Sequence, residues 1–147
     1  MIAIASDHGA YHLKEAVKAH LTKRGLVYED FGTNSTESCD YPEFAAKAAR
    51  AVAAGACDRG IVLCTTGIGV SIVANKISGI RCALCVTPFM AEMTRRHNDS
   101  NVLALGAALN EEAESLAIVD IWLDSDFEGG RHQNRVDKIT QIEASQE

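Results

Sequence analysis

Short apolar runs alternate with helical stretches at a regular pace along this chain, and no other feature constrains its fold as strongly. Five runs have the length and composition of strands: "MIAIA", "VYEDF", "GIVLC", "RCALCV" and "NVLAL". Four of them are nearly continuous in small and branched apolar residues, which is typical of strands buried on both faces. Because alternating strands and helices connect through right-handed crossovers, we predict a Rossmann-like five-stranded parallel sheet inside a three-layer α/β/α sandwich.

Helical patterns fill the intervals between these runs. We predict helices over residues 10–24 and about 41–54, from near Gly69, after Pro88 and after Asn110, and over about 130–143. Asp40 is a candidate N-cap of the second helix. With 147 residues, 47% of them hydrophobic, the chain is long enough for one core, and we expect a single domain over 1–147.

Composition excludes several classes of protein. A net charge of −6 disfavours a nucleic-acid-binding surface, and no run approaches the roughly 20 apolar residues that a membrane span needs. The opening "MIAIASDHGA" has no basic leader, and five cysteines without a framework indicate reduced thiols, so we expect a cytoplasmic protein. "RCALC" has a C-x-x-C spacing, but on a strand Cys82 and Cys85 point to opposite faces, which predicts core cysteines rather than a shared metal.

Cys64 stands at the end of the third strand and is followed by a glycine-bearing turn, "TTGIG", that leads into a helix. In a parallel sheet such junctions are where ligands bind. A thiol near a helix N-terminus ionises more readily, and the backbone N–H groups there can hold an anionic oxygen. This pairing suits nucleophilic attack, or removal of a proton from carbon next to a carbonyl. The alternative is that Cys64 is a small core side chain and the glycines only form a turn.

Known motifs do not account for this stretch. Ile72 stands where a dinucleotide-binding motif would have its third glycine, and the ending of a phosphate-binding P-loop is absent. Val70 occupies the position where a cysteine phosphatase would carry its arginine.

Other polar residues follow the remaining junctions. Asp7 and His8 come after the first strand, where a plain capping role is an equal possibility. His97 lies near the end of a predicted helix, where the negative end of the helix dipole stabilises a protonated imidazole, so this position does not by itself require a catalytic role.

Arg131 and Arg135 stand four apart in the opening turns of the last helix. Their like charges repel each other and the positive end of the helix dipole repels both, whereas a bound anion would make both effects favourable. Ordinary solvent-facing arginines or a salt bridge are the alternatives.

The stretches "SDHG", "DYP", "TGIGVSIVANK", "RRHNDSNVLALG" and "EGGRHQNRV" together resemble the ribose-5-phosphate isomerase type B family, which is related to galactose-6-phosphate isomerase. The resemblance runs in order through nearly the whole chain. It implies an aldose–ketose isomerase that interconverts ribose 5-phosphate and ribulose 5-phosphate through an enediolate. No metal and no cofactor is implied. The resemblance also implies a homodimer, or a dimer of dimers, in which the neighbouring subunit completes each site.

The resemblance also assigns roles to residues. Cys64 matches the base that moves a proton between C1 and C2, and Thr66 matches a hydroxyl that assists in stabilising the enediolate. His97 matches the histidine that opens the sugar ring, and Asn98 matches an asparagine that helps to position the substrate. The remaining matches are to substrate-binding residues: Asp7, His8, Tyr41, Thr65, Gly67, Ile68, Gly69, Arg131 and Arg135, the two arginines holding phosphate. The helix over about 130–143 would then contribute both to the dimer and to the phosphate site.

Two departures from the family pattern affect the expected substrate. Thr65 replaces a glycine found in many relatives, and Ala108 replaces a basic residue that commonly lies two positions after the glycine matching Gly106. One phosphate contact is therefore expected to be missing. A tetrose phosphate or a 6-phosphohexose remains an alternative substrate, and a non-catalytic sugar-phosphate-binding module is an alternative function. A thiol redox enzyme is a weaker one, since no resolving cysteine lies beside Cys64 in sequence.

Overall fold

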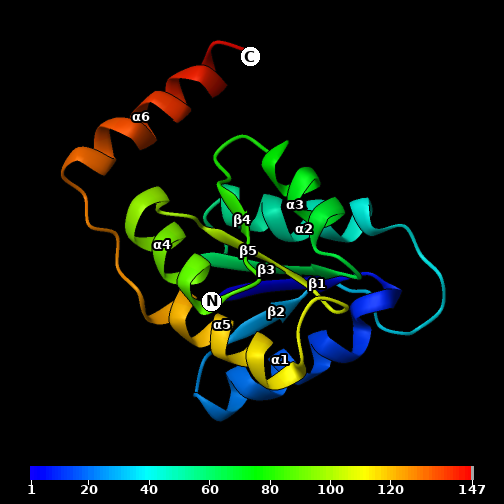
Figure 1. Ribbon diagram of the computed structural model, residues 1–147. Helices are drawn as coiled ribbons and strands as arrows, with labels where there is room; N and C mark the ends of the chain where they lie inside the picture. The colour runs from blue at the N-terminus through cyan, green and yellow to red at the C-terminus, as the bar shows by residue number, and fades with distance from the viewer. Residues whose placement is uncertain (147) are drawn as a thin grey trace.

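A single parallel sheet forms the centre of the molecule, which is described over residues 1–146 by a computed structural model (Figure 1). Its strands are β1 (Ile2–Ser6), β2 (Tyr28–Asp30), β3 (Arg59–Cys64), β4 (Cys82–Leu84) and β5 (Val102–Gly106), in the order β2-β1-β3-β5-β4. Every pairing is parallel. Strands β1 and β5 are buried along their whole length, which explains why their sequences are continuously apolar. The predicted five-stranded parallel sheet is confirmed.

Helices cover both faces of this sheet, as the prediction of three layers requires. They are α1 (Tyr11–Lys23), α2 (Tyr41–Ala53), α3 (Ile68–Asn75), α4 (Pro88–Asn98), α5 (Glu112–Asp124) and α6 (Arg131–Ala144). One core packs α1, α4 and α5 against one face through residues such as Val17, Ala91 and Trp122. A second core packs α2 and α3 against the other face through Ala48 and Val70. Within residues 1–146, no helix is both long and apolar enough to cross a membrane.

Several local predictions change in detail. The edge strands β2 and β4 have only three residues each, because an edge strand has a single neighbour to pair with. A 3₁₀ turn over His8–Ala10 precedes α1, and Asp7 caps it. Asp40 does stand at the N-cap position of α2, but its side chain makes no capping hydrogen bond there.

The two cysteines of the C-x-x-C spacing lie on opposite sides of the sheet, as predicted. Cys85 is buried in the core under α1, α4 and α5, whereas Cys82 packs against the core under α2 and α3. The alternation of side chains along β4 therefore separates the two thiols.

Helix α6 departs from the three layers and extends away from them at the side of α4 (Figure 1). Val136 is buried on its inner face, and near its end Glu143 accepts a hydrogen bond from the Gly79 N–H at 3.0 Å. Ile139 and Ile142 on the same helix are 48% and 61% exposed. A helix held by so few contacts within its own chain leaves much of its surface open.

Candidate active site

A pocket of about 430 Å³ opens beside Cys64 at the carboxyl edge of the sheet. Its lining residues come from the ends of β1 and β3 and the starts of α2 and α3: Asp7, Tyr41, Cys64, Thr65, Thr66, Ile68, Gly69 and Ile72. Strands β1 and β3 are neighbours, but the helices that follow them, α1 and α3, cover opposite faces. The pocket therefore lies at the switch point of the sheet, where doubly wound folds bind their ligands.

The Cys64 sulfur accepts a hydrogen bond from the backbone N–H of Gly67 at 3.2 Å. The thiol side chain is almost fully enclosed, with the residue only 5% exposed. Gly67 has a φ of +73°, and a Cβ there would lie 2.9 Å from the carbonyl carbon of Leu105. A glycine is thus required for the turn that directs this N–H at the sulfur.

Helix α3 begins directly after this turn, so its N-terminus faces the same pocket through Ile68 and Gly69. The first N–H groups of a helix have no partner inside the helix and carry its partial positive charge. The Thr66 hydroxyl oxygen accepts a weak hydrogen bond from the Ile68 N–H at 3.4 Å. The thiol and the backbone N–H groups therefore lie together, as the strand-to-helix pattern predicted, and the Thr66 hydroxyl lies beside them.

The loop after β5 holds the cysteine loop in place. The N–H groups of Ala107 and Ala108 donate to the carbonyl oxygens of Cys64 and Thr65 at 3.0 and 2.9 Å. These bonds tie the turn to the neighbouring strand, so the backbone around the sulfur is positioned by the sheet.

Tyr41, the first residue of α2, lines the pocket beside the start of α3. A Cβ on Gly69 would lie 2.6 Å from the Tyr41 Cζ atom, so the ring is in close contact with the backbone of α3. Ile72 is a lining residue that the sequence analysis did not identify. The sequence did contain a signal for Ile72, because it stands four residues after Ile68 and therefore on the same face of α3. Both residues are more than half exposed.

Asp7 lines the pocket and at the same time caps the 3₁₀ turn, where its Oδ1 accepts from the Ala10 N–H at 3.2 Å. Its capping role is therefore real, and it leaves the second carboxylate oxygen for other partners. His8 is not among the lining residues. Its Nδ1 accepts the Cys39 N–H at 3.2 Å, which holds the imidazole against the loop that precedes α2.

His97 and Asn98 lie at the other edge of the sheet. Helix α4 starts after the carboxyl end of β4 and runs back, so it ends beside the amino ends of the strands. There the Arg81 guanidinium donates to the Asn98 carbonyl at 2.9 Å, and Arg81 directly precedes β4. The length of β5 alone, about 16 Å for its five residues, separates this edge from Cys64. One chain therefore does not bring Cys64 and His97 together.

Instead, His97 belongs to a cluster with Glu128 and His132, which the sequence analysis did not single out. The His97 Nε2 is 3.3 Å from the Glu128 Oε2, and the His97 and His132 rings stack with centroids 4.1 Å apart. Burial and the nearby positive charges of His97 and Arg131 lower the pKa of His132. Burial alone would raise the pKa of Glu128, but the positive charges of Arg96, His97 and His132 hold it below its usual value. The stretch "EGGRHQNR" contains both missed residues, so the signal was present in the sequence.

Arg131 and Arg135 lie in the opening turns of α6, as predicted, on the helix that also carries His132. Both are exposed, and neither guanidinium makes an ion pair or hydrogen bond to another residue within 1–146.

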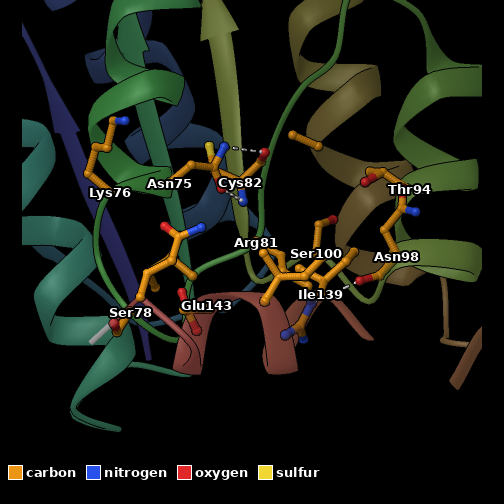
Figure 2. A pocket seen from close by; sticks show the side chains of 14 residues that line it. Asn75, Lys76, Ser78, Arg81, Cys82, Thr94, Asn98, Ser100, Ile139 and Glu143 are labelled. Carbon is orange, nitrogen blue, oxygen red and sulfur yellow. Dashed lines mark hydrogen bonds between the residues drawn. The ribbon is translucent and has the colours of Figure 1, made fainter. Parts of the chain in front are cut away.

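Asn98 lines a separate groove of about 630 Å³. Three parts of the chain form this groove: the segment that leads into β4, helix α4 and helix α6. Figure 2 shows Arg81, Asn98, Ile139 and Glu143 around it. This groove contains none of the residues that line the Cys64 pocket.

The fold and the pocket define the chain as a doubly wound α/β protein with a pocket at the switch point of its sheet. The ribose/galactose isomerase family model matches residues 2–139. Ribose-5-phosphate isomerase B of Escherichia coli is 49% identical over 142 residues, which are 97% of this chain and 95% of that protein.

Two solved structures are similar as well. Ribose-5-phosphate isomerase B of Clostridium thermocellum superposes with a TM-score of 0.98 at 53% identity and covers 99% of both chains. Ribose-5-phosphate isomerase B of Mycoplasma genitalium, solved with bound ribulose-5-phosphate, gives a TM-score of 0.93 at 40% identity over 97% of this chain and 95% of that one. The chain belongs to the ribose/galactose isomerase family, whose members are aldose–ketose isomerases.

Proposed function

We propose that this protein interconverts ribose 5-phosphate and ribulose 5-phosphate. The names of its relatives in Escherichia coli and Clostridium thermocellum support this substrate, as does the ribulose-5-phosphate bound to the relative from Mycoplasma genitalium. In the chain itself, the observation that carries the proposal is the hydrogen bond from the Gly67 N–H to the Cys64 sulfur, inside a pocket at a helix N-terminus. Such a donor stabilises a thiolate more than a thiol.

In this proposal the Cys64 thiolate removes the proton from C2 of the open-chain aldose. The C2–H electron pair forms the C1–C2 double bond, and the aldehyde oxygen takes up the negative charge of an enediolate. The proton on sulfur then returns to C1, the proton of the C2 hydroxyl passes to the C1 oxygen, and the ketose results. The N–H groups at the start of α3 and the Thr66 hydroxyl stabilise the charged oxygens during this exchange.

The ring-opening and phosphate-binding residues come from a second copy of the chain. His97, Asn98, Arg131 and Arg135 lie on α4 and α6, whereas the lining of the Cys64 pocket includes no residue of these helices. Only a neighbouring chain that presents its α4 and α6 to this pocket supplies both halves. The exposed Ile139 and Ile142 on α6 give such a neighbour an apolar surface to bury. We therefore infer a homodimer, or a dimer of dimers, and a role for α6 in both the dimer and the phosphate site.

Within that site the partner's arginines hold the phosphate, the partner's histidine opens the furanose ring, and the partner's asparagine positions the sugar. The chain that carries Cys64 binds the sugar through Asp7, His8, Tyr41, Thr65 and the backbone of residues 67–69. His8 would need to exchange its contact with Cys39 for one with substrate, because its Nδ1 already accepts a hydrogen bond there.

Ala108 is the observation that favours a second substrate. It is exposed, and its N–H donates to the carbonyl of Thr65, so it lies beside the loop that carries Cys64. Because a basic side chain is missing at this position, a sugar phosphate of another length, such as a 6-phosphohexose or a tetrose phosphate, is the alternative.

A substrate panel tests these proposals. Ketose formation is followed from ribose 5-phosphate, a tetrose phosphate and 6-phosphohexoses, and we expect the highest kcat/KM for ribose 5-phosphate. A higher kcat/KM for another aldose phosphate reassigns the substrate. Saturable binding of ribose 5-phosphate without any turnover indicates a binding module instead.

A further inference from the structure

Three side chains with metal-ligating atoms converge where α4 ends and α6 begins. His97, Glu128 and His132 each offer one such atom, and all three atoms lie within 4.8 Å of one another. They come from separate parts of the chain, the end of α4, the loop after α5 and the start of α6, so helical spacing alone does not create the cluster. Two imidazoles and one carboxylate form a donor set typical of zinc and similar ions.

The distances between the donor atoms are close to those around a four-coordinate ion, whereas the orientation of the rings requires a rearrangement. At metal–ligand bonds of about 2.0–2.2 Å, two ligands of a tetrahedral site stand roughly 3.3 Å apart. The His97 Nε2 and the Glu128 Oε2 are already at 3.3 Å. The His132 Nε2 is 4.0 Å from the same oxygen, and its ring is stacked on that of His97 at an interplanar angle of 9°. One of the two imidazoles must therefore turn about its Cβ–Cγ bond before both nitrogens point at one ion. Glu128 has a half-exposed side chain, which leaves the fourth position open to water.

Neighbouring groups hold the carboxylate in place. The Glu128 Oε1 accepts a hydrogen bond from the Arg96 guanidinium at 3.3 Å, and the Glu128 N–H donates to the Arg96 carbonyl at 3.0 Å. These contacts leave Oε2 directed at the two imidazoles. Such outer contacts orient ligands in established metal sites.

Two nearby cations oppose a metal ion at this place. Arg131 and Arg135 stand in the opening turns of the same helix as His132, but both side chains are exposed to water, which screens their charge.

We propose that His97, Glu128 and His132 form a binding site for one divalent transition-metal ion of the zinc class per chain. This site goes beyond the proposed isomerisation, which needs no metal, and its occupancy is measured without any sugar present. Because His97 is also the proposed ring-opening residue, a bound ion would occupy the imidazole that the reaction uses.

Binding of Co²⁺ to the full-length protein tests the proposal, because its visible absorption bands report coordination number and ligand type. We expect saturation at one ion per chain, a spectrum of nitrogen and oxygen ligation without thiolate charge transfer, and displacement by Zn²⁺. Removing one ligand with His132→Ala or Glu128→Gln weakens binding by more than the 10- to 100-fold that loss of an outer-shell partner typically costs.

The matched control is His20→Ala, since His20 also pairs with a carboxylate, Asp120 at 2.7 Å, but belongs to no group of three metal-ligating side chains within residues 1–146. This variant keeps full Co²⁺ binding. Because His132 is buried and its loss could disturb folding, the nearly isosteric Glu128→Gln carries the same expectation at an exposed position. No saturable Co²⁺ spectrum, a thiolate spectrum, or unchanged affinity in Glu128→Gln overturns the proposal.

Discussion

The backbone N–H of Gly67 donates a hydrogen bond to the sulfur of Cys64 at 3.2 Å, across a turn of three residues. The turn ends where α3 begins, so the sulfur receives a direct donor and also lies close to the positive end of a helix. If this sulfur is the base, Cys64→Ala lowers kcat by about 10²- to 10⁴-fold, the usual contribution of general base catalysis.

The affinity for a phosphorylated competitive inhibitor should change little in Cys64→Ala, because the proposed phosphate contacts lie elsewhere. Cys57→Ala is the matched control, since this thiol is also buried but precedes β3 at the opposite edge of the sheet. Turnover of Cys64→Ala near that of the control would remove the cysteine from the mechanism.

Comparing Gly67→Ala with Gly25→Ala separates the free-energy cost of left-handed backbone from the cost of the steric contact at Gly67. Gly67 and Gly25 have nearly the same φ, +73° and +74°, but a Cβ meets backbone 2.9 Å away only at Gly67, while nothing lies within 4 Å at Gly25. We expect Gly25→Ala to lower the free energy of unfolding by about 1–2 kcal/mol, the cost of left-handed backbone. Gly67→Ala should cost at least about 1 kcal/mol more and reduce kcat, as measured by denaturant unfolding and initial rates. Equal unfolding energies would contradict the close approach.

Mixed oligomers test whether the site spans two chains. Cys64→Ala and His97→Ala are each expected to have little activity alone. Co-expression of the two gives hybrids in which one site carries both substitutions and the other carries neither, so about one quarter of the activity of the unsubstituted protein returns for a dimer with random pairing. No recovery in hybrids of verified composition would mean that each chain uses its own Cys64 and His97.

Arg131 and Arg135 make no ion pair within residues 1–146, so their removal should leave thermal stability unchanged. We expect Arg131→Ala or Arg135→Ala to raise KM for the phosphorylated substrate by about tenfold or more, since a charge-assisted hydrogen bond contributes roughly 1.5–3 kcal/mol. Lys138→Ala, on the exposed surface of the same helix, is the control for net charge. A KM equal to that of the control would place phosphate binding elsewhere.

The free energy of unfolding should fall at acid pH in part because of Asp30. Burial by itself would raise the pKa of this carboxyl, but hydrogen bonds from Lys14, Lys18 and the Gly32 N–H outweigh burial and lower it. A carboxyl with a lower pKa in the folded state stabilises the fold above its unfolded value of about 3.9, and this stabilisation is lost as pH falls through the folded pKa. Unfolding free energies measured between pH 7 and 3 should therefore fall less steeply for Asp30→Asn. A slope identical to that of the unsubstituted protein would show that Asp30 does not contribute.

Local patterns predicted those parts of the site that lie close together in sequence. Residues 64–69 form one continuous turn and helix start, so a strand pattern followed by glycines was enough to place the thiol at a helix N-terminus. The two faces of β4 followed equally from side-chain alternation, which separates Cys82 from Cys85. The lengths of β2 and β4 did not follow, because pairing at a sheet edge depends on the neighbour and not on the strand's own composition.

The sequence by itself determined the α/β architecture and the position of the Cys64 thiol at a helix N-terminus, because apolar periodicity and turn residues act over a few positions. Only the tertiary structure decided how distant segments meet. The direction of α4 places His97 at the opposite edge of the sheet from Cys64, and the loop before α6 brings Glu128 and His132 to it. Such placements depend on how whole helices pack, which no local spacing of residues encodes.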